Sequence, residues 1–152
     1  MSDTVLTNMK EGVLTITLNR PEALNALDRE LSETLQESIL TAEQDKKVRC
    51  VVIRGGEQFM AGGDLKYFAE NLDVNPSEKR IMFEGFINQV HKIIFSIRQM
   101  PKPVVASIRG PAAGFGLSLA MACDLAIASD DAFFTLASVS YTHLTLPTIL
   151  LV

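Results

Sequence analysis

Two junctions decide the fold, IRGGEQFMAGGDL (residues 53–65) and IRGPAAGFGLSL (residues 108–119). Each passes from an apolar strand pattern, through glycine and alanine, into a helical pattern. A helix N-terminus offers unpaired N–H groups and partial positive charge, and small residues let a ligand approach the backbone. Two such ends that meet would form a two-donor site for a negatively charged oxygen, each donor contributing about 3–4 kcal/mol. One junction alone would indicate only a tight turn and close packing.

Strand and helix patterns alternate along the rest of the chain. The predicted strands are residues 4–10 and 13–18 as a hairpin, then 51–53, 104–108, 125–128 and 133–136. Helices are predicted from residue 28, from residue 64, from residues 75–77 and up to residue 123, whereas residues 19–27 and 110–116 are predicted as loops. This alternation predicts an α/β fold with a mainly parallel sheet, in which Val51–Ile53 and Val104–Ile108 are buried, adjacent or near-adjacent strands.

The two long helices have apolar residues at helical spacing. Asp28 is the expected N-cap of the first, Lys46 and Lys47 are cations suited to its end, and its apolar face is Leu27, Leu31, Leu35, Ile39 and Ala42. The second is expected to stop at Pro101, with a buried stripe of Phe83, Phe86, Ile87, Val90, Ile94 and Ile97. His91 is expected at the edge of the core.

Composition excludes several classes of protein. The chain has 152 residues, 47% hydrophobic and 21% charged, which predicts one globular domain rather than disorder. Its net charge of -4, with no Lys/Arg block, argues against nucleic-acid binding. Cys50 and Cys123 cannot supply a disulfide framework or a zinc site, and with no export signal at the N-terminus they favour a cytoplasmic location.

The last 21 residues, from Ala132, contain no charged side chain. Serine, threonine, histidine and Pro147 within them argue against a membrane span. The run VSYTHLTLPT (residues 139–148) resembles the translation of a widely used sequencing-library adapter. We therefore expect an incomplete domain over residues 1–138 and a read-through tail over residues 139–152. The alternative is a natural, hydrophobic, β-rich terminus.

Four motifs resemble those of the crotonase, or enoyl-CoA hydratase/isomerase, superfamily. They are NRPEALNAL (19–27), FMAGGDLK (59–66), MPKPVVA (100–106) and GPAAGFGLSLAMACD (110–124), and the resemblance extends from about Val5 to Ser138. It implies a spiral of ββα units, truncated before the C-terminal helical region that drives trimer assembly. It also implies binding of an acyl-CoA thioester and stabilisation of its enolate.

The resemblance assigns roles by motif position. The backbone N–H groups of Gly63 and Phe115 match the two oxyanion donors. The residues that match the adenine end of the coenzyme A site are Ala26, Asp64, Leu65 and Lys66. Lys66 is either a phosphate partner or a solvated helix lysine. Coenzyme A is part of the substrate, so no separate cofactor and no metal is implied.

The chain departs from the hydratase pattern at the groups that move protons. The two glutamate positions of hydratases fall on Ser118 and at about Ser138. A serine hydroxyl is no general base near neutral pH without an activating partner. We therefore expect an isomerase, or another enolate reaction using one acid, rather than a two-glutamate hydratase. The resemblance implies a homotrimer or hexamer for the full-length protein; the alternative is a non-catalytic, truncated fragment.

Two other motifs are incomplete. GLSLA (116–120) lacks the final glycine of the hydrolase elbow, and Ser118 is expected inside a helix rather than on a turn. Gly114-Phe-Gly116 lacks the third glycine of a dinucleotide fingerprint, because Leu119 stands there. Neither a serine hydrolase nor a dinucleotide site is expected. The carboxylates Glu57, Asp64 and Glu84 are read as caps or solvated residues.

Overall fold

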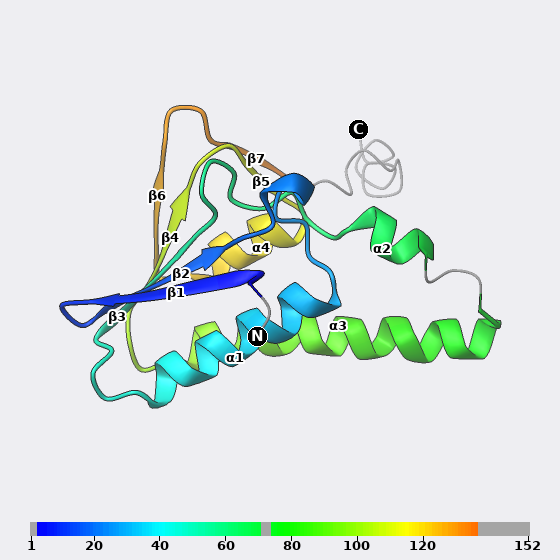
Figure 1. The fold of residues 1–152 in the computed structure, drawn as a ribbon, viewed down its shortest axis with the longest axis horizontal. Coiled ribbons are helices and arrows are strands. Elements are labelled where there is room, and N and C mark those ends of the chain that lie inside the picture. The colour runs from blue at the N-terminus through cyan, green and yellow to red at the C-terminus, as the bar shows by residue number, and fades with distance from the viewer. Residues whose placement is uncertain (1–2, 71–73, 137–152) are drawn as a thin grey trace, which may run out of the picture.

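The structure, a computed structural model, describes residues 3–70 and 74–136. Its main sheet has the strand order β1-β2-β3-β4-β6, and helices pack beneath it (Figure 1). The main-sheet strands are β1 (Val5–Lys10), β2 (Val13–Leu18), β3 (Cys50–Arg54), β4 (Val104–Ile108) and β6 (Leu125–Ala128). The helices are α1 (Arg29–Gln44), α2 (Leu65–Glu70), α3 (Pro76–Gln99) and α4 (Phe115–Ala122), with a short 3-10 turn at Pro21–Ala23.

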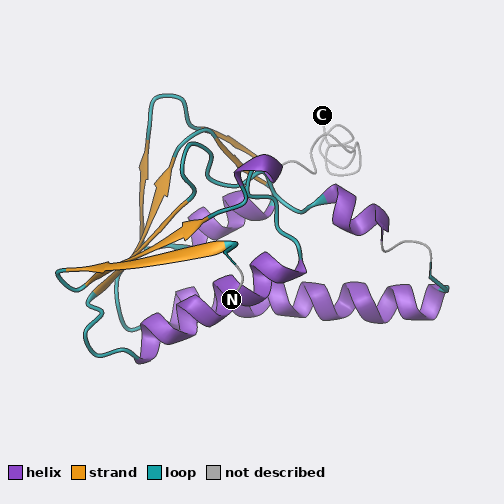
Figure 2. Ribbon diagram, in the orientation of Figure 1, coloured by secondary structure: helices purple, strands orange, loops and turns teal. Residues whose placement is uncertain are grey.

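The mainly parallel sheet predicted from the sequence is confirmed. Only the hairpin β1–β2 is antiparallel, and β2, β3, β4 and β6 then pair in parallel. Val51 of β3 lies opposite Val104 of β4, so the two predicted buried strands are direct neighbours. The helical connections between parallel strands lie against the sheet (Figure 2), which buries its apolar side chains.

A second sheet pairs β5 (Pro111–Ala113) in parallel with β7 (Phe133–Thr135). Of these two strands, only β7 was predicted from the sequence. The loop prediction for residues 110–116 is wrong over β5, because Pro-Ala-Ala carries no strand-like alternation. Pairing makes this segment a strand: the Met60 N–H donates to the Pro111 carbonyl at 2.9 Å, and the Ala113 N–H donates to the Met60 carbonyl at 2.9 Å.

Helix α1 begins as predicted and ends differently. The Asp28 carboxylate accepts from the Leu31 N–H at 2.8 Å, which makes Asp28 the N-cap. The helix ends at Gln44, so Lys46 and Lys47 lie beyond it. The cation at the helix end is Lys102, whose Nζ donates to the Ala42 carbonyl at 2.6 Å and to the Asp45 carbonyl at 2.7 Å.

Helix α3 packs against the rest of the protein mainly through its second half. It begins at Pro76, within the predicted start at residues 75–77, and Asn75 caps it; Ile93 and Ile97 are its buried residues. Ile87 is 48% exposed, so its assignment to the buried stripe is wrong. His91 is exposed rather than at the core edge. The first half of α3 extends beyond the sheet beside α2 (Figure 1), where one face has less to pack against.

Several large apolar side chains of the second half of the chain face solvent. They are Met121, Leu125, Ile127, Phe133, Phe134 and Leu136. Within residues 3–70 and 74–136, no helix combines the length and apolarity that a bilayer span requires. Ser138 and the predicted tail of residues 139–152 lie outside the described residues.

Candidate active site

The buried side-chain amide of Asn25 fixes the backbone of the first junction. Asn25 is 2% exposed, and its Nδ2 donates to the carbonyls of Gln58 at 2.6 Å, Phe59 at 3.2 Å and Gly55 at 3.3 Å. The backbone of Asn25 has a φ of 54°, in the left-handed region that asparagine tolerates better than most residues. Asn25 thus fixes the loop between β3 and the glycine pair. This role of Asn25 was not predicted from the sequence, although an asparagine within a loop is typical of a turn that needs a left-handed backbone.

The second junction lies directly against the first. A Cβ placed on Gly62 would lie 3.2 Å from the Ala113 carbonyl oxygen, and one on Gly116 would lie 2.4 Å from the Met60 carbonyl oxygen. Side chains at these two positions would separate the segments. The small residues therefore do more than make turns, because they let two backbone segments that are far apart in sequence touch.

Each junction presents a backbone donor at its end. The Leu27 N–H donates to Gly62 at 2.7 Å and the Asp64 N–H donates to Leu27 at 3.0 Å, so the intervening Gly63 N–H points away from that bridge. Phe115 is the first residue of α4, where N–H groups have no acceptor within the helix. Neither N–H donates to an acceptor within residues 3–70 and 74–136.

Ser118 lies one turn into α4 and is exposed. Its hydroxyl donates to the Gly114 carbonyl at 3.4 Å, the backbone contact of an ordinary helical serine. The helical location argued against a hydrolase elbow, and the structure confirms that location. His91 is on α3 with its ring against Phe95.

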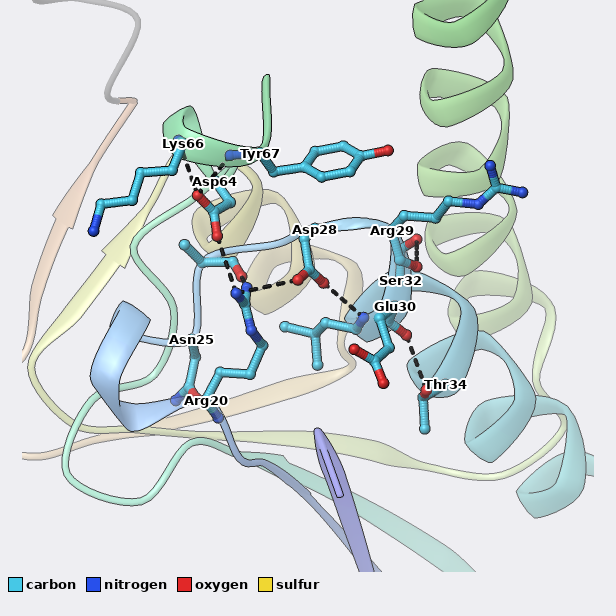
Figure 3. Close-up of polar contacts among 12 residues, drawn as sticks. Arg20, Asn25, Asp28, Arg29, Glu30, Ser32, Thr34, Asp64, Lys66 and Tyr67 are labelled. Atoms are coloured by element: carbon cyan, nitrogen blue, oxygen red, sulfur yellow. Dashed lines mark hydrogen bonds and ion pairs between the residues drawn. The ribbon is translucent and has the colours of Figure 1, made fainter. Parts of the chain in front are cut away.

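The structure brings only some of the predicted coenzyme A residues together. Ala26 and Asp64 are buried and are joined through Arg20, whose guanidinium donates to the Ala26 carbonyl and to the Asp64 carboxylate (Figure 3). Leu65 is 69% exposed and Lys66 is also exposed, so their side chains point into solvent rather than toward Ala26.

The Asp64 carboxylate is already satisfied by the protein. One oxygen accepts from the backbone N–H groups of Lys66 at 3.0 Å and Tyr67 at 3.2 Å, and the other pairs with Arg20 at 3.1 Å. Burial alone would raise the pKa of Asp64, but the bonds from Tyr67, Arg20 and Lys66 outweigh it and hold the pKa below its usual value. The prediction that Asp64 is a cap is therefore confirmed, because its side chain caps the start of α2.

An aromatic group borders the first junction. The rings of Tyr67, Phe68, Phe83 and Phe86 contact one another with centroids 5.4–5.8 Å apart. A pocket of about 450 Å³ opens beside this group between α1, α2 and α3, and Tyr67, Met82 and Phe86 are among the residues that line it. Its lining includes neither Gly63 nor Phe115.

Residues 8–144 match the family model described as enoyl-CoA hydratase/isomerase. The chain is similar to 1,2-epoxyphenylacetyl-CoA isomerase of Escherichia coli (strain K12), with 34% identity over 90% of this chain and 52% of the relative. It is 35% identical to trans-2-decenoyl-[acyl-carrier-protein] isomerase of Streptococcus mutans, over 90% of this chain and 51% of the relative.

The fold agrees with these sequence matches. The crystal structure of an enoyl-CoA hydratase from Mycobacterium smegmatis superposes with a TM-score of 0.81 and 34% identity, covering 91% of this chain and 52% of that one. The chain therefore spans about half the length of the relatives it matches. Its motifs, its fold and these matches agree, and the chain belongs to the enoyl-CoA hydratase/isomerase family, also called the crotonase family.

Proposed function

We propose that this chain binds an acyl-CoA thioester and stabilises its enolate with the backbone N–H groups of Gly63 and Phe115. The observation that carries the proposal is the close approach of the two junctions just before the donors, where a Cβ on Gly62 would lie 3.2 Å from the Ala113 carbonyl oxygen and 3.8 Å from the Gly114 Cα. Removal of a proton next to a thioester carbonyl places negative charge on the carbonyl oxygen. Fixed donors aimed at that oxygen stabilise the charge, each by about 2.7–4 kcal/mol.

The proposed chemistry is of the isomerase type. One carboxylate acts as a base that takes a proton from the carbon next to the carbonyl, and its acid form then gives the proton to a different carbon, which moves the double bond without adding water. Ser118 supports this choice, because it stands at the first glutamate position and its hydroxyl is bonded only to helix backbone. The similar proteins include members named as isomerases and members named as hydratases, so Ser118 carries this choice.

Coenzyme A is proposed to bind at the Arg20-linked loop and the start of α2. The backbone of Ala26, Asp64 and Leu65 would hold the adenine end, and the exposed Lys66 would pair with a phosphate. A role in fatty acid metabolism, a cytoplasmic location and assembly into trimers or hexamers belong to the same proposal.

A second candidate is that this chain on its own is a non-catalytic fragment. The exposed Leu125 and Ile127 on the edge strand β6, together with Met121, favour it. Apolar surface of this kind ordinarily contacts a partner or another part of a protein. This candidate predicts that the chain does not hydrate or isomerise short enoyl-CoA substrates.

A spectroscopic titration tests the main proposal without requiring turnover. The probe is 4-(dimethylamino)cinnamoyl-CoA, a thioester whose absorbance moves to longer wavelength when hydrogen bonds polarise its carbonyl. We expect the chain to bind the probe with a red shift. Phe115→Pro deletes one donor at a helix position that accepts proline, so most of the shift should disappear while the fold persists.

Ser118→Ala is the matched control on the same helix and should keep the shift. Equal losses for Ser118→Ala and Phe115→Pro would overturn the backbone-donor proposal. Absence of binding, or binding with no shift, would overturn it as well. A full shift without conversion of crotonyl-CoA or a 3-enoyl-CoA would support the fragment candidate for this chain.

A further inference from the structure

Arg20 lies two residues beyond the end of β2 and has a fixed backbone. Its N–H donates to the Asn25 side-chain oxygen at 2.8 Å, and its carbonyl accepts from the N–H groups of Ala23 at 3.0 Å and Asn25 at 2.9 Å. The side chain therefore starts from a defined point at the end of the sheet. Only 17% of it is exposed, unlike an ordinary loop arginine.

The guanidinium of Arg20 joins the caps of two helices. Nη2 lies 3.1 Å from an Asp28 carboxylate oxygen and 3.1 Å from an Asp64 carboxylate oxygen, and Nη1 donates to the Ala26 carbonyl (Figure 3). Each aspartate uses its other oxygen to cap a helix, α1 for Asp28 and α2 for Asp64. One planar cation thus connects two helix starts that are 36 residues apart, from Asp28 to Asp64.

These contacts surround the bridge that holds Gly63. Leu27 pairs with Gly63 through the two backbone bonds of the parallel bridge. Arg20 holds the residue before Leu27, the residue after Leu27 and the residue after Gly63. The direction of the Gly63 N–H therefore depends on whether this guanidinium keeps the two backbone segments in register.

The Arg20 contacts differ from the other ion pairs of the described chain. Arg29–Glu33 and Arg80–Glu84 join neighbouring turns of one helix and are exposed, which makes them worth little. Arg20 is shielded and links segments distant in sequence. The fork of a guanidinium can reach several acceptors in fixed directions, which a lysine ammonium does not reproduce.

We propose that Arg20 is a positioning residue, which aims the Gly63 N–H at the thioester oxygen by clamping Ala26, Asp28 and Asp64. The inference rests on the proposed function of Gly63. It assigns Arg20 no contact with the acyl group, so its removal should misdirect the donor and lower the red shift even when the probe is fully bound.

The test uses Arg20→Gln, Arg20→Lys and the matched control Arg80→Gln, whose arginine pairs only on the exposed face of α3. Dissociation constants and red shifts are measured with 4-(dimethylamino)cinnamoyl-CoA. With the probe at saturating concentration, Arg20→Gln should reduce the red shift to below about half, whatever its effect on the dissociation constant, because Ala26 and Asp64 also belong to the proposed coenzyme A site. Arg20→Lys should restore part of the shift, and Arg80→Gln should match the unsubstituted chain.

Two further measurements keep the result interpretable. Asp64→Asn keeps a cap oxygen for α2 but weakens the pair with Arg20, so it should also lower the red shift. This variant replaces Arg20→Gln if Arg20→Gln does not fold.

Amide NMR of the probe-free chain should show the Gly63 resonance displaced by Arg20→Gln and unmoved by Arg80→Gln. This readout stands even if the unsubstituted chain gives no red shift, which would overturn the proposed function alone. An unchanged Gly63 resonance and red shift in Arg20→Gln would overturn the positioning role, as would equal effects of Arg80→Gln.

Discussion

The ring of Phe68 occupies the space in which a side chain at position 63 would begin. A Cβ built on Gly63 would lie 2.8 Å from Cε2 of Phe68, closer than two carbon atoms can pack. Phe68 contacts Phe83 and Phe86 through its ring, so the proposed donor at Gly63 borders the aromatic group of α2 and α3. The absence of a side chain at position 63 and the presence of this ring are therefore coupled.

Gly63→Ala should push the Phe68 ring aside at a modest cost, about 1 kcal/mol in the free energy of unfolding, because a half-buried side chain can rotate. In a Phe68→Ala background the same substitution should cost nothing measurable. Urea unfolding of the four proteins of this double-mutant cycle checks the coupling. Equal costs in the two backgrounds would show that Phe68 does not limit the space at Gly63.

Gly116→Ala should be more damaging than Gly63→Ala. The new methyl group would lie 2.4 Å from the Met60 carbonyl oxygen and 2.8 Å from its Cβ, and backbone cannot rotate away. Alanine gains about 1 kcal/mol of helix propensity, but overpacking costs about 1–3 kcal/mol and also separates the two junctions. We expect net destabilisation by up to about 2 kcal/mol in urea unfolding.

The control for Gly116→Ala is Gly85→Ala. Gly85 is exposed on α3, and a Cβ there meets nothing within 4 Å. Only the propensity gain remains, so this variant should be more stable by up to about 1 kcal/mol. If Gly116→Ala were stabilising to the same extent, the close approach of the two junctions would be refuted.

Asp64 should make the protein less stable in acid. Because the folded protein lowers the pKa of this carboxyl group, the stabilisation is present above the ordinary aspartate pKa of about 4 and is lost as pH falls below it. Asp64→Asn should therefore be less stable than the unsubstituted chain at neutral pH, with a difference that shrinks in acid. Urea unfolding across a pH series measures this, and a constant difference would contradict it.

The two cysteines should differ in reactivity. Burial, helped by the charge of Asp124, raises the pKa of the Cys123 thiol to about 12, so it stays protonated and covered at pH values near 8. Cys50 is half-buried on β3. Iodoacetamide should modify Cys50 in the folded chain and both cysteines in urea, as peptide mass mapping would show. Modification of Cys123 at the same rate as Cys50 before unfolding would contradict its burial.

Local pattern was enough to predict most of the fold. Alternation identified β1 and β2, and strand and helix patterns in sequence correctly implied parallel neighbours at Val51 and Val104. Helical spacing did not predict the whole buried face of α3. Ile87 fits the spacing but is 48% exposed, whereas its neighbour Phe86 packs against the core. For Pro111–Ala113, pairing with Met60 and β7 creates a strand that composition does not suggest.

The candidate site was predictable as far as motifs reach. The resemblance assigns Gly63 and Phe115 by motif position, and their role as donors stays a prediction. The structure shows that the two junctions meet, because a Cβ on Gly62 would lie 3.2 Å from the Ala113 carbonyl oxygen. Arg20 was not predictable, because its partners Asp28 and Asp64 stand 8 and 44 residues away. Such contacts depend on the topology that brings the segments together. No sequence pattern within residues 19–27 indicates these contacts.

The Gly114 N–H donates to the Thr135 carbonyl at 3.0 Å, immediately before the proposed donor at Phe115. A ribosome adds Thr135 twenty residues after Phe115, whereas the bridge partner of Gly63, Leu27, is made 36 residues before Gly63. During synthesis a domain generally folds as a unit. The segment before Gly63 also depends on late residues, because Met60 exchanges backbone hydrogen bonds with Pro111 and Ala113. Both sides of the proposed oxyanion site are therefore completed only after residues up to Thr135 have left the ribosome.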